Sequence, residues 1–265
     1  MIDRQIDGSV GIITLNRPEK YNVLDAQGYR DLADAFRDFS EDSRVRVVKV
    51  QASGKAFCAG SNIEECLKES VQEFRDHYAN VGAMLKAAST CKKPTVAKLH
   101  GYALGGGCGL AAACDMAYAA EDTVFGVPEV DLQIFPTTVM PPFFKAMNQK
   151  QMFAFLFLGE KFQAPRAREL GLITDYCAGE VLDQMVDQIV LKIASTNPVA
   201  IQMGKEALLV AREMHMADAY DYLYNIMAMI ASSEAAGVRM REFVEEKRRK
   251  SEAKRKLRAA SGAAV

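Results

Sequence analysis

The chain has 265 residues, of which 49% are hydrophobic and 25% charged, a composition that favours a soluble globular protein of one domain, with or without an appended subdomain. Its 33 Lys and Arg residues nearly balance its 34 Asp and Glu residues, and the net charge of −1 argues against a nucleic-acid binder that works through bulk charge. No apolar run approaches the roughly 20 residues of a membrane-spanning helix, which excludes that class of protein.

Targeting and metal-binding patterns are not visible either. Met1 leads directly into the charged Asp3 and Arg4, so no signal peptide is seen and we expect a cytoplasmic protein. The six cysteines form no CxxC pair and are expected to be free thiols. The three histidines form no HxxxH pair, so we expect no metal site.

The first half of the chain alternates predicted strands and helices. Residues 27–39 place apolar side chains on one helical face, and Ser70 with Glu73 forms a capping box that opens a second helix. Four short apolar segments predict strands, namely Val10–Leu15, Val45–Gln51, Pro94–Leu99 and Cys114–Ala119. This alternation predicts an α/β fold with a mainly parallel sheet or a spiral of βα units.

The second half changes character and is predicted to be nearly all helical from Gln149 onward. The expected helices cover 149–157, 165–170, 180–195, 198–212, 216–231 and the residues from 233 onward. Residues 239–258 contain ten Lys or Arg and four Asp or Glu, a local charge of +6 that is typical of a solvated helix.

Glycines cluster between a predicted strand and a helical apolar run. At such a junction Gly105, Gly106 and Gly107 let backbone N–H groups approach an anion from a helix N-terminus. The spacing fits neither the G-x-G-x-x-G pattern nor a P-loop. An isolated glycine triplet more often makes a tight turn, so this motif alone leaves both interpretations open.

Several ordered segments together give a more specific signal, because from about Asp7 to Arg249 the chain resembles the crotonase (enoyl-CoA hydratase/isomerase) superfamily. The matching segments include Thr14–Asn22, Ala56–Ser61, Gly101–Cys108, Phe125–Glu129, Ala167–Ile173, Asn197–Ile201 and Phe243–Lys247. The resemblance implies a crotonase (ClpP-like) fold, with a spiral of ββα units over residues 1–195 and a helical trimerisation region over 196–265. It further implies a homotrimer or hexamer, which the apolar, Met-rich stretch 214–230 also favours.

The resemblance also implies an acyl-CoA thioester as substrate, with no cofactor beyond the coenzyme A of that substrate. From the balanced charge and the lack of a long apolar run we expect no nucleic-acid or membrane partner. In the family two backbone N–H groups form an oxyanion hole, and the matching positions here are Ser61 and Gly106. A catalytic glutamate of the family matches Glu129. Other positions expected to contact the acyl group or coenzyme A are Arg17, Lys20, Ala59, Gly105, Gly109, Phe135 and Lys247.

Gly109 departs from the family pattern, because two-glutamate hydratases carry a carboxylate at this position. Hydration in those relatives uses both carboxylates, whereas one carboxylate can move a proton between two carbons. We therefore expect double-bond isomerisation or an atypical hydration, and we expect the missing side chain to free volume for a bulkier acyl group. Asp131 is an alternative second carboxylate, although a capping or solvated role is the simpler expectation.

Two other classes of function stay open at this point. Gly109 is equally compatible with an acyl-CoA hydrolase or decarboxylase of the same superfamily. Some relatives bind RNA or act as assembly factors, and the basic segment 239–258 suits such a role. Retention of Glu129 argues against a scaffold that has lost catalysis.

Overall fold

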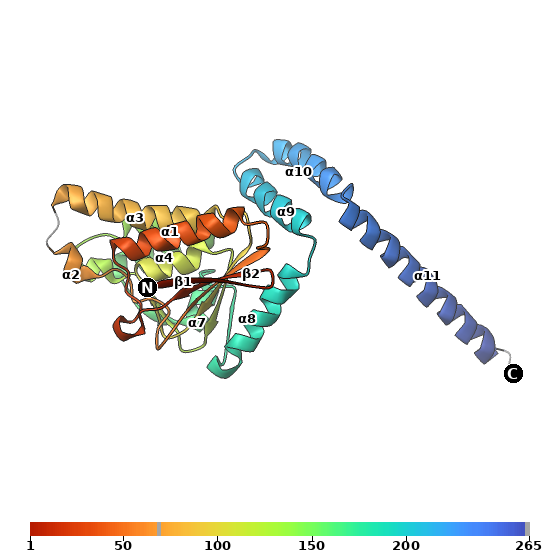
Figure 1. Ribbon diagram of the computed structural model, residues 1–265, viewed down its shortest axis with the longest axis horizontal. Helices are drawn as coiled ribbons and strands as arrows, with labels where there is room; N and C mark the ends of the chain where they lie inside the picture. The colour runs from red at the N-terminus through yellow and green to blue at the C-terminus, as the bar shows by residue number, and fades with distance from the viewer. Residues whose placement is uncertain (68–69, 263–265) are drawn as a thin grey trace. The chain divides into compact units, whose positions relative to one another are not determined.

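The computed structural model describes the backbone of residues 1–67 and 70–262 (Figure 1). The chain divides into two compact units, Met1–Ser195 and Thr196–Val265. Within the described residues, no helix is long and apolar enough to cross a membrane. Among those same residues, no group of three or more His, Cys, Asp or Glu side chains could hold a metal ion. Cys58, Cys91, Cys108, Cys114 and Cys177 are free thiols, and the side chain of Cys66 lies outside the described ones.

A six-stranded sheet with the order β1-β2-β3-β4-β6-β9 forms the centre of the first unit. The β1–β2 pair is antiparallel, and the other neighbouring pairs are parallel. The strands are β1 (Ile2–Asp7), β2 (Val10–Leu15), β3 (Val47–Ala52), β4 (Thr95–Leu99), β6 (Met116–Ala120) and β9 (Asp175–Cys177). The four predicted strands are confirmed, with β3, β4 and β6 beginning one or two residues later than expected.

Helices cover both faces of this sheet. One face packs against α1 (Ala26–Glu41), α3 (Val71–Ser89) and α4 (Gly106–Ala113), and the other packs against α8 (Gly179–Ala194) (Figure 1). Alternate residues of β2 enter the two cores, with Ile13 and Leu15 on the first face and Val10 and Ile12 on the second. Burial on both faces explains why β2 is a nearly continuous apolar run.

A smaller three-stranded sheet joins β5 (Tyr102–Leu104), β7 (Val124–Gly126) and β8 (Phe162–Gln163). Strands β5 and β7 are parallel, so they end at the same edge. The chain enters α4 after β5, and after β7 it enters the 3₁₀ helix η2 (Pro128–Leu132). The remaining elements of this unit are η1 (Pro18–Lys20), α2 (Ile63–Cys66), η3 (Thr137–Val139), α5 (Met140–Ala146), α6 (Gln149–Leu158) and α7 (Ala164–Glu169).

The six helices predicted from Gln149 onward are confirmed, and two short strands that the sequence analysis did not predict lie between α6 and α8. Strands β8 and β9 lie there and extend the two sheets. Each has two or three residues, too few for an alternating pattern to separate them from a loop.

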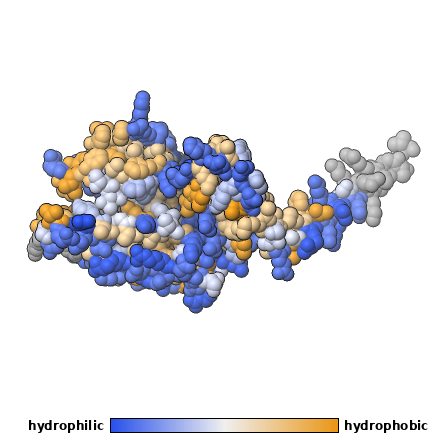
Figure 2. All heavy atoms as spheres, turned by 90° about the horizontal axis from the view of Figure 1, so that it is seen from above, coloured by the Kyte–Doolittle hydropathy of each residue, from blue (hydrophilic) through white to orange (hydrophobic). Residues whose placement is uncertain are grey.

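The second unit consists of α9 (Pro198–Ala211), α10 (Met216–Ala231) and α11 (Glu234–Gly262), in agreement with the predicted helices. Many of its apolar side chains are exposed, and Figure 2 shows apolar atoms along these helices. The most exposed on α10 are Met216, Tyr220, Tyr224, Met227 and Met229. The side chains from residue 254 onward, which include part of the basic segment, lie outside the described ones.

Candidate active site

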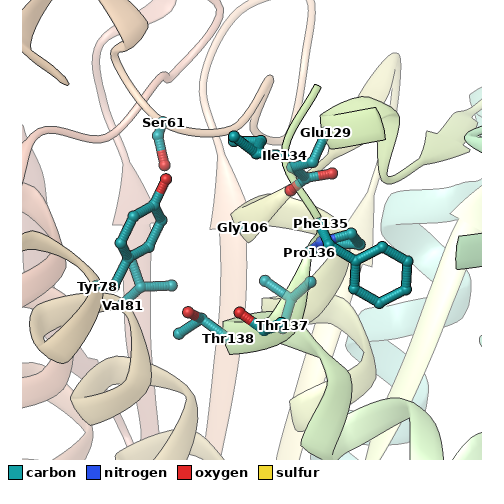
Figure 3. A pocket seen from close by; sticks show the side chains of 11 residues that line it. Ser61, Tyr78, Val81, Gly106, Glu129, Ile134, Phe135, Pro136, Thr137 and Thr138 are labelled. Atoms are coloured by element: carbon teal, nitrogen blue, oxygen red, sulfur yellow. The ribbon is translucent and has the colours of Figure 1, made fainter. Parts of the chain in front are cut away.

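A cavity of about 160 Å³ opens in the first unit where α3, α4, η2 and η3 converge. Its lining comprises Ser61, Tyr78, Val81, Gly106, Glu129 and residues 134–139, the last three of which form η3. Figure 3 shows the hydroxyl groups of Ser61 and Tyr78 facing each other, with the Glu129 carboxylate across the cavity from them. Three residues expected from the sequence to carry the chemistry therefore share one cavity.

Backbone hydrogen bonds hold the Ser61 segment beside the start of α4. The Cys58 amide donates to the Tyr102 carbonyl at 2.9 Å, and the Leu104 amide donates back to the Cys58 carbonyl at 2.9 Å. The Asn62 amide donates to the Leu24 carbonyl at 2.8 Å. Because β5 continues into α4, these bonds bring the Ser61 segment next to the start of α4.

The amide groups of Ser61 and Gly106 have the properties of anion donors. Gly106 is the first residue of α4, where an N–H group has no partner within the helix and the helix dipole is positive. In the described part of the chain, neither amide donates to a backbone or side-chain acceptor of the protein. Both are therefore available to an anionic oxygen in the cavity.

Glu129 reaches the cavity because β7 ends beside β5 and leads into η2. A methyl group built on Gly105 would lie 3.1 Å from Glu129 Oε1, so the carboxylate rests against the glycine backbone. Gly105 also has a φ of +51°, a conformation that favours glycine. Burial raises the pKa of Glu129 above its ordinary value, and among the described residues its buried Oε2 has no hydrogen-bond partner. A buried, poorly solvated carboxylate suits a general base.

The expectation of free volume at Gly109 is wrong. A Cβ atom built on Gly109 would lie 3.0 Å from Val139 Cγ1 and 3.3 Å from Leu85 Cδ2. Val139 fills this space and itself lines the cavity, so Gly109 lies behind the cavity wall. Asp131 is exposed and lies outside the lining, and Glu129 is the cavity's carboxylate among the described residues.

The other sequence-predicted site residues lie in different places. Phe135 lines the cavity, and its ring contacts Phe157 at a centroid distance of 5.6 Å. Ala59 and Gly105 lie beside the lining without being part of it. Arg17 forms ion pairs with Asp25 at 3.2 Å and Glu19 at 3.8 Å, whereas Lys20 is exposed on η1 and Lys247 lies on α11 in the second unit.

The sequence analysis missed most of the lining residues and also Tyr29, which lies behind them. Tyr78 and Val139 line the cavity, and the fully buried Tyr29 bonds to Ser61 Oγ at 2.7 Å through its hydroxyl group. Tyr29 lies three residues before Leu32 on the apolar face of α1, so helical periodicity predicts its burial. Tyr78 is three residues before Val81 on α3, but it is exposed, so periodicity does not identify it. No local pattern marks Val139 as a wall residue.

Comparisons with known proteins agree with this geometry. A family model described as enoyl-CoA hydratase/isomerase matches residues 5–253. A probable enoyl-CoA hydratase of Rhizobium meliloti is 31% identical over 91% of this chain and 93% of its own length. The mitochondrial Delta(3,5)-Delta(2,4)-dienoyl-CoA isomerase of Mus musculus is 29% identical over 80% of this chain and 69% of its own.

Among solved structures, an enoyl-CoA hydratase from Mycobacterium smegmatis superimposes with a TM-score of 0.89 at 31% identity. The alignment covers 92% of this chain and 96% of that one. The predicted crotonase fold is thereby confirmed. With the family model matching nearly its whole length, the chain belongs to the enoyl-CoA hydratase/isomerase family and is an enzyme of the crotonase superfamily.

Proposed function

We propose that this enzyme moves a carbon–carbon double bond of an enoyl-CoA thioester, with Glu129 as the proton carrier. The observation that carries the proposal is the composition of the cavity. Among its described lining residues it contains one carboxylate and two available amide donors, and Val139 occupies the place beside Gly109 where a second carboxylate would extend.

The thioester oxygen would lie between the Ser61 and Gly106 amides. Removal of a proton from the α-carbon shifts negative charge onto that oxygen, giving an enolate conjugated with the double bond. Fixed N–H donors stabilise such a charge without reorganisation, and one donor is typically worth roughly 10²–10³ in rate. The positive N-terminal end of α4 adds to the same field.

Glu129 would accept the α-proton and return it to the γ-carbon. The protonated carboxyl group is the product of the first step and the acid of the second, so the site ends in its starting state. A raised pKa makes the carboxylate a stronger base and keeps the proton on it between the two steps. Hydration needs a further group to activate water, and the described cavity lining offers none with a negative charge.

Coenzyme A is expected to lie outside the cavity. Lys20 is exposed on η1 and suits a phosphate of the nucleotide, whereas the guanidinium of Arg17 already pairs with two carboxylates. We further propose that the enzyme self-associates through its second unit, because exposed Met and Tyr side chains on α10 favour burial against another subunit.

The test compares 2-enoyl-, 3-enoyl-, dienoyl- and cyclic enoyl-CoA thioesters, with products separated by mass. Isomerisation leaves the mass unchanged, whereas hydration adds the mass of water. Glu129→Gln should lose at least about a hundredfold in rate while still binding the thioester. Asp131→Asn is the matched control, because Asp131 is two residues away and exposed. Efficient hydration by the wild type, or an active Glu129→Gln variant, would contradict the proposal.

A further inference from the structure

The hydroxyl group of Tyr29 contacts both segments that carry the amide donors. It lies 2.7 Å from Ser61 Oγ, a hydrogen bond in which either oxygen can donate. A methyl group built on Gly106 would lie 2.5 Å from the same hydroxyl oxygen, so Tyr29 is in close contact with the first residue of α4. The buried Tyr29 side chain therefore lies between the Ser61 and Gly106 segments, with a hydrogen bond to the first and a packing contact with the second.

Packing leaves the Tyr29 ring little freedom. The side chain is 0% exposed, and its ring meets the His77 ring on α3 edge-on at a centroid distance of 5.8 Å. On α1, Asp25 caps the helix by accepting from the Gly28 amide at 2.8 Å. These contacts restrict where the hydroxyl group can lie, and its hydrogen bond to Ser61 satisfies a buried polar group.

We propose that Tyr29 is a positioning residue that sets the spacing and orientation of the Ser61 and Gly106 amides. This inference rests on the function proposed above. The hydrogen bond fixes the Ser61 side chain and through it the adjoining peptide plane, while contact with the ring sets how closely the start of α4 approaches. A donor displaced by about 1 Å from the reacting oxygen loses much of its effect on rate, roughly 10²-fold in unfavourable cases.

Three variants test this role. Tyr29→Phe keeps the ring and removes the hydroxyl, Ser61→Ala removes the other end of the bond, and the double variant removes both. We expect each single variant to lower kcat roughly tenfold, because a misplaced donor costs less than the roughly 10²–10³ of a donor that is lost. KM should change less than about twofold. The double variant should be no slower than the slower single variant, because all three lack the same bond.

Tyr118→Phe is the matched control. Tyr118 is 8% exposed and belongs to the core on the opposite face of the sheet, so loss of its hydroxyl should leave kcat unchanged. A second readout is the carbonyl stretching frequency of butanoyl-CoA, an unreactive saturated thioester, bound to each variant. Two aligned donors lower this frequency, and we expect Tyr29→Phe and Ser61→Ala to shift it back toward the value of the free thioester.

The two readouts separate failure of this inference from failure of the proposed function. A wild type that binds butanoyl-CoA without lowering the frequency would overturn the oxyanion site, and with it the role of Tyr29. A lowered frequency in the wild type that stays unchanged in both single variants, together with unchanged kcat, would overturn only the role of Tyr29. If Tyr29→Phe does not fold, Ser61→Ala alone decides, because it breaks the same bond at the edge of the cavity.

Discussion

Replacing Gly109 with glutamate gives the chain the two carboxylates of a hydratase-type site. We expect this single substitution to destabilise the protein and not to raise its hydration rate. Gly109 lies inside α4, and a Cβ atom there would lie 3.0 Å from Val139 Cγ1, 3.1 Å from Val139 Cβ and 3.3 Å from Leu85 Cδ2. Favourable carbon contacts lie at about 3.5–4.0 Å, so these neighbours must move. Val139 and Leu85 are both buried in the main core.

The expected loss follows from these contacts. Overpacking a well-packed core costs about 1–3 kcal/mol, and a buried polar group without a partner costs roughly as much again. Removing a glycine from a helix interior returns up to about 1 kcal/mol. We therefore expect Gly109→Glu to lower the free energy of unfolding by a net amount on the order of 1–6 kcal/mol.

A second substitution, Val139→Ala, tests whether this clash is the cause, because it removes the Cγ1 atom that obstructs the new side chain. Urea unfolding at fixed protein concentration, and hydration of a short 2-enoyl-CoA, are measured for both single variants and the double variant. We expect a favourable coupling of at least about 1 kcal/mol between the two changes, and hydration above the wild-type rate only in the double variant. Gly109→Glu alone that is as stable as the wild type and hydrates faster would refute this reasoning.

Further expected outcomes concern Glu129 and the second unit. On the acid side of its pH profile, kcat/KM should fall at a pH above 4.5, the ordinary pKa of a glutamate, because burial raises the pKa of the Glu129 base. A fall in kcat/KM only at or below pH 4.5 would contradict the burial argument. In the unfolded chain this carboxyl titrates at its ordinary pKa, and in the folded protein it holds its proton to higher pH, so wild-type stability falls as pH rises from 4.5 through the raised pKa. Glu129→Gln should accordingly unfold at higher urea concentration than the wild type at pH 7, and this advantage should vanish below pH 4.5; equal midpoints at pH 7 would show that the carboxylate is well solvated. Sedimentation should find a trimer or hexamer at micromolar concentration, and Met227→Glu, which adds a charge to the exposed apolar side of α10, should shift it toward monomer, whereas a stable wild-type monomer would exclude self-association.

Sequence alone determined the elements whose signals are local. Strand β2 begins and ends where its apolar run does, and the capping box of Ser70 and Glu73 marks the start of α3. Strand β1 was missed because it is an edge strand whose residues alternate only weakly between exposed and half-buried positions. The resemblance to a known family gave Ser61, Gly106 and Glu129, and the structure brings all three to one cavity.

Only the tertiary structure decided what fills the space around those residues. From the sequence, Gly109 is a missing side chain, and an empty volume is the natural expectation. The structure places Val139 there, from a 3₁₀ helix thirty residues further along the chain. Tyr29 shows the same limit, because helical periodicity predicts that it is buried and says nothing of its contact with Ser61 and Gly106. Periodicity reports which face of an element is covered, whereas the identity of the covering atoms depends on how distant elements cross.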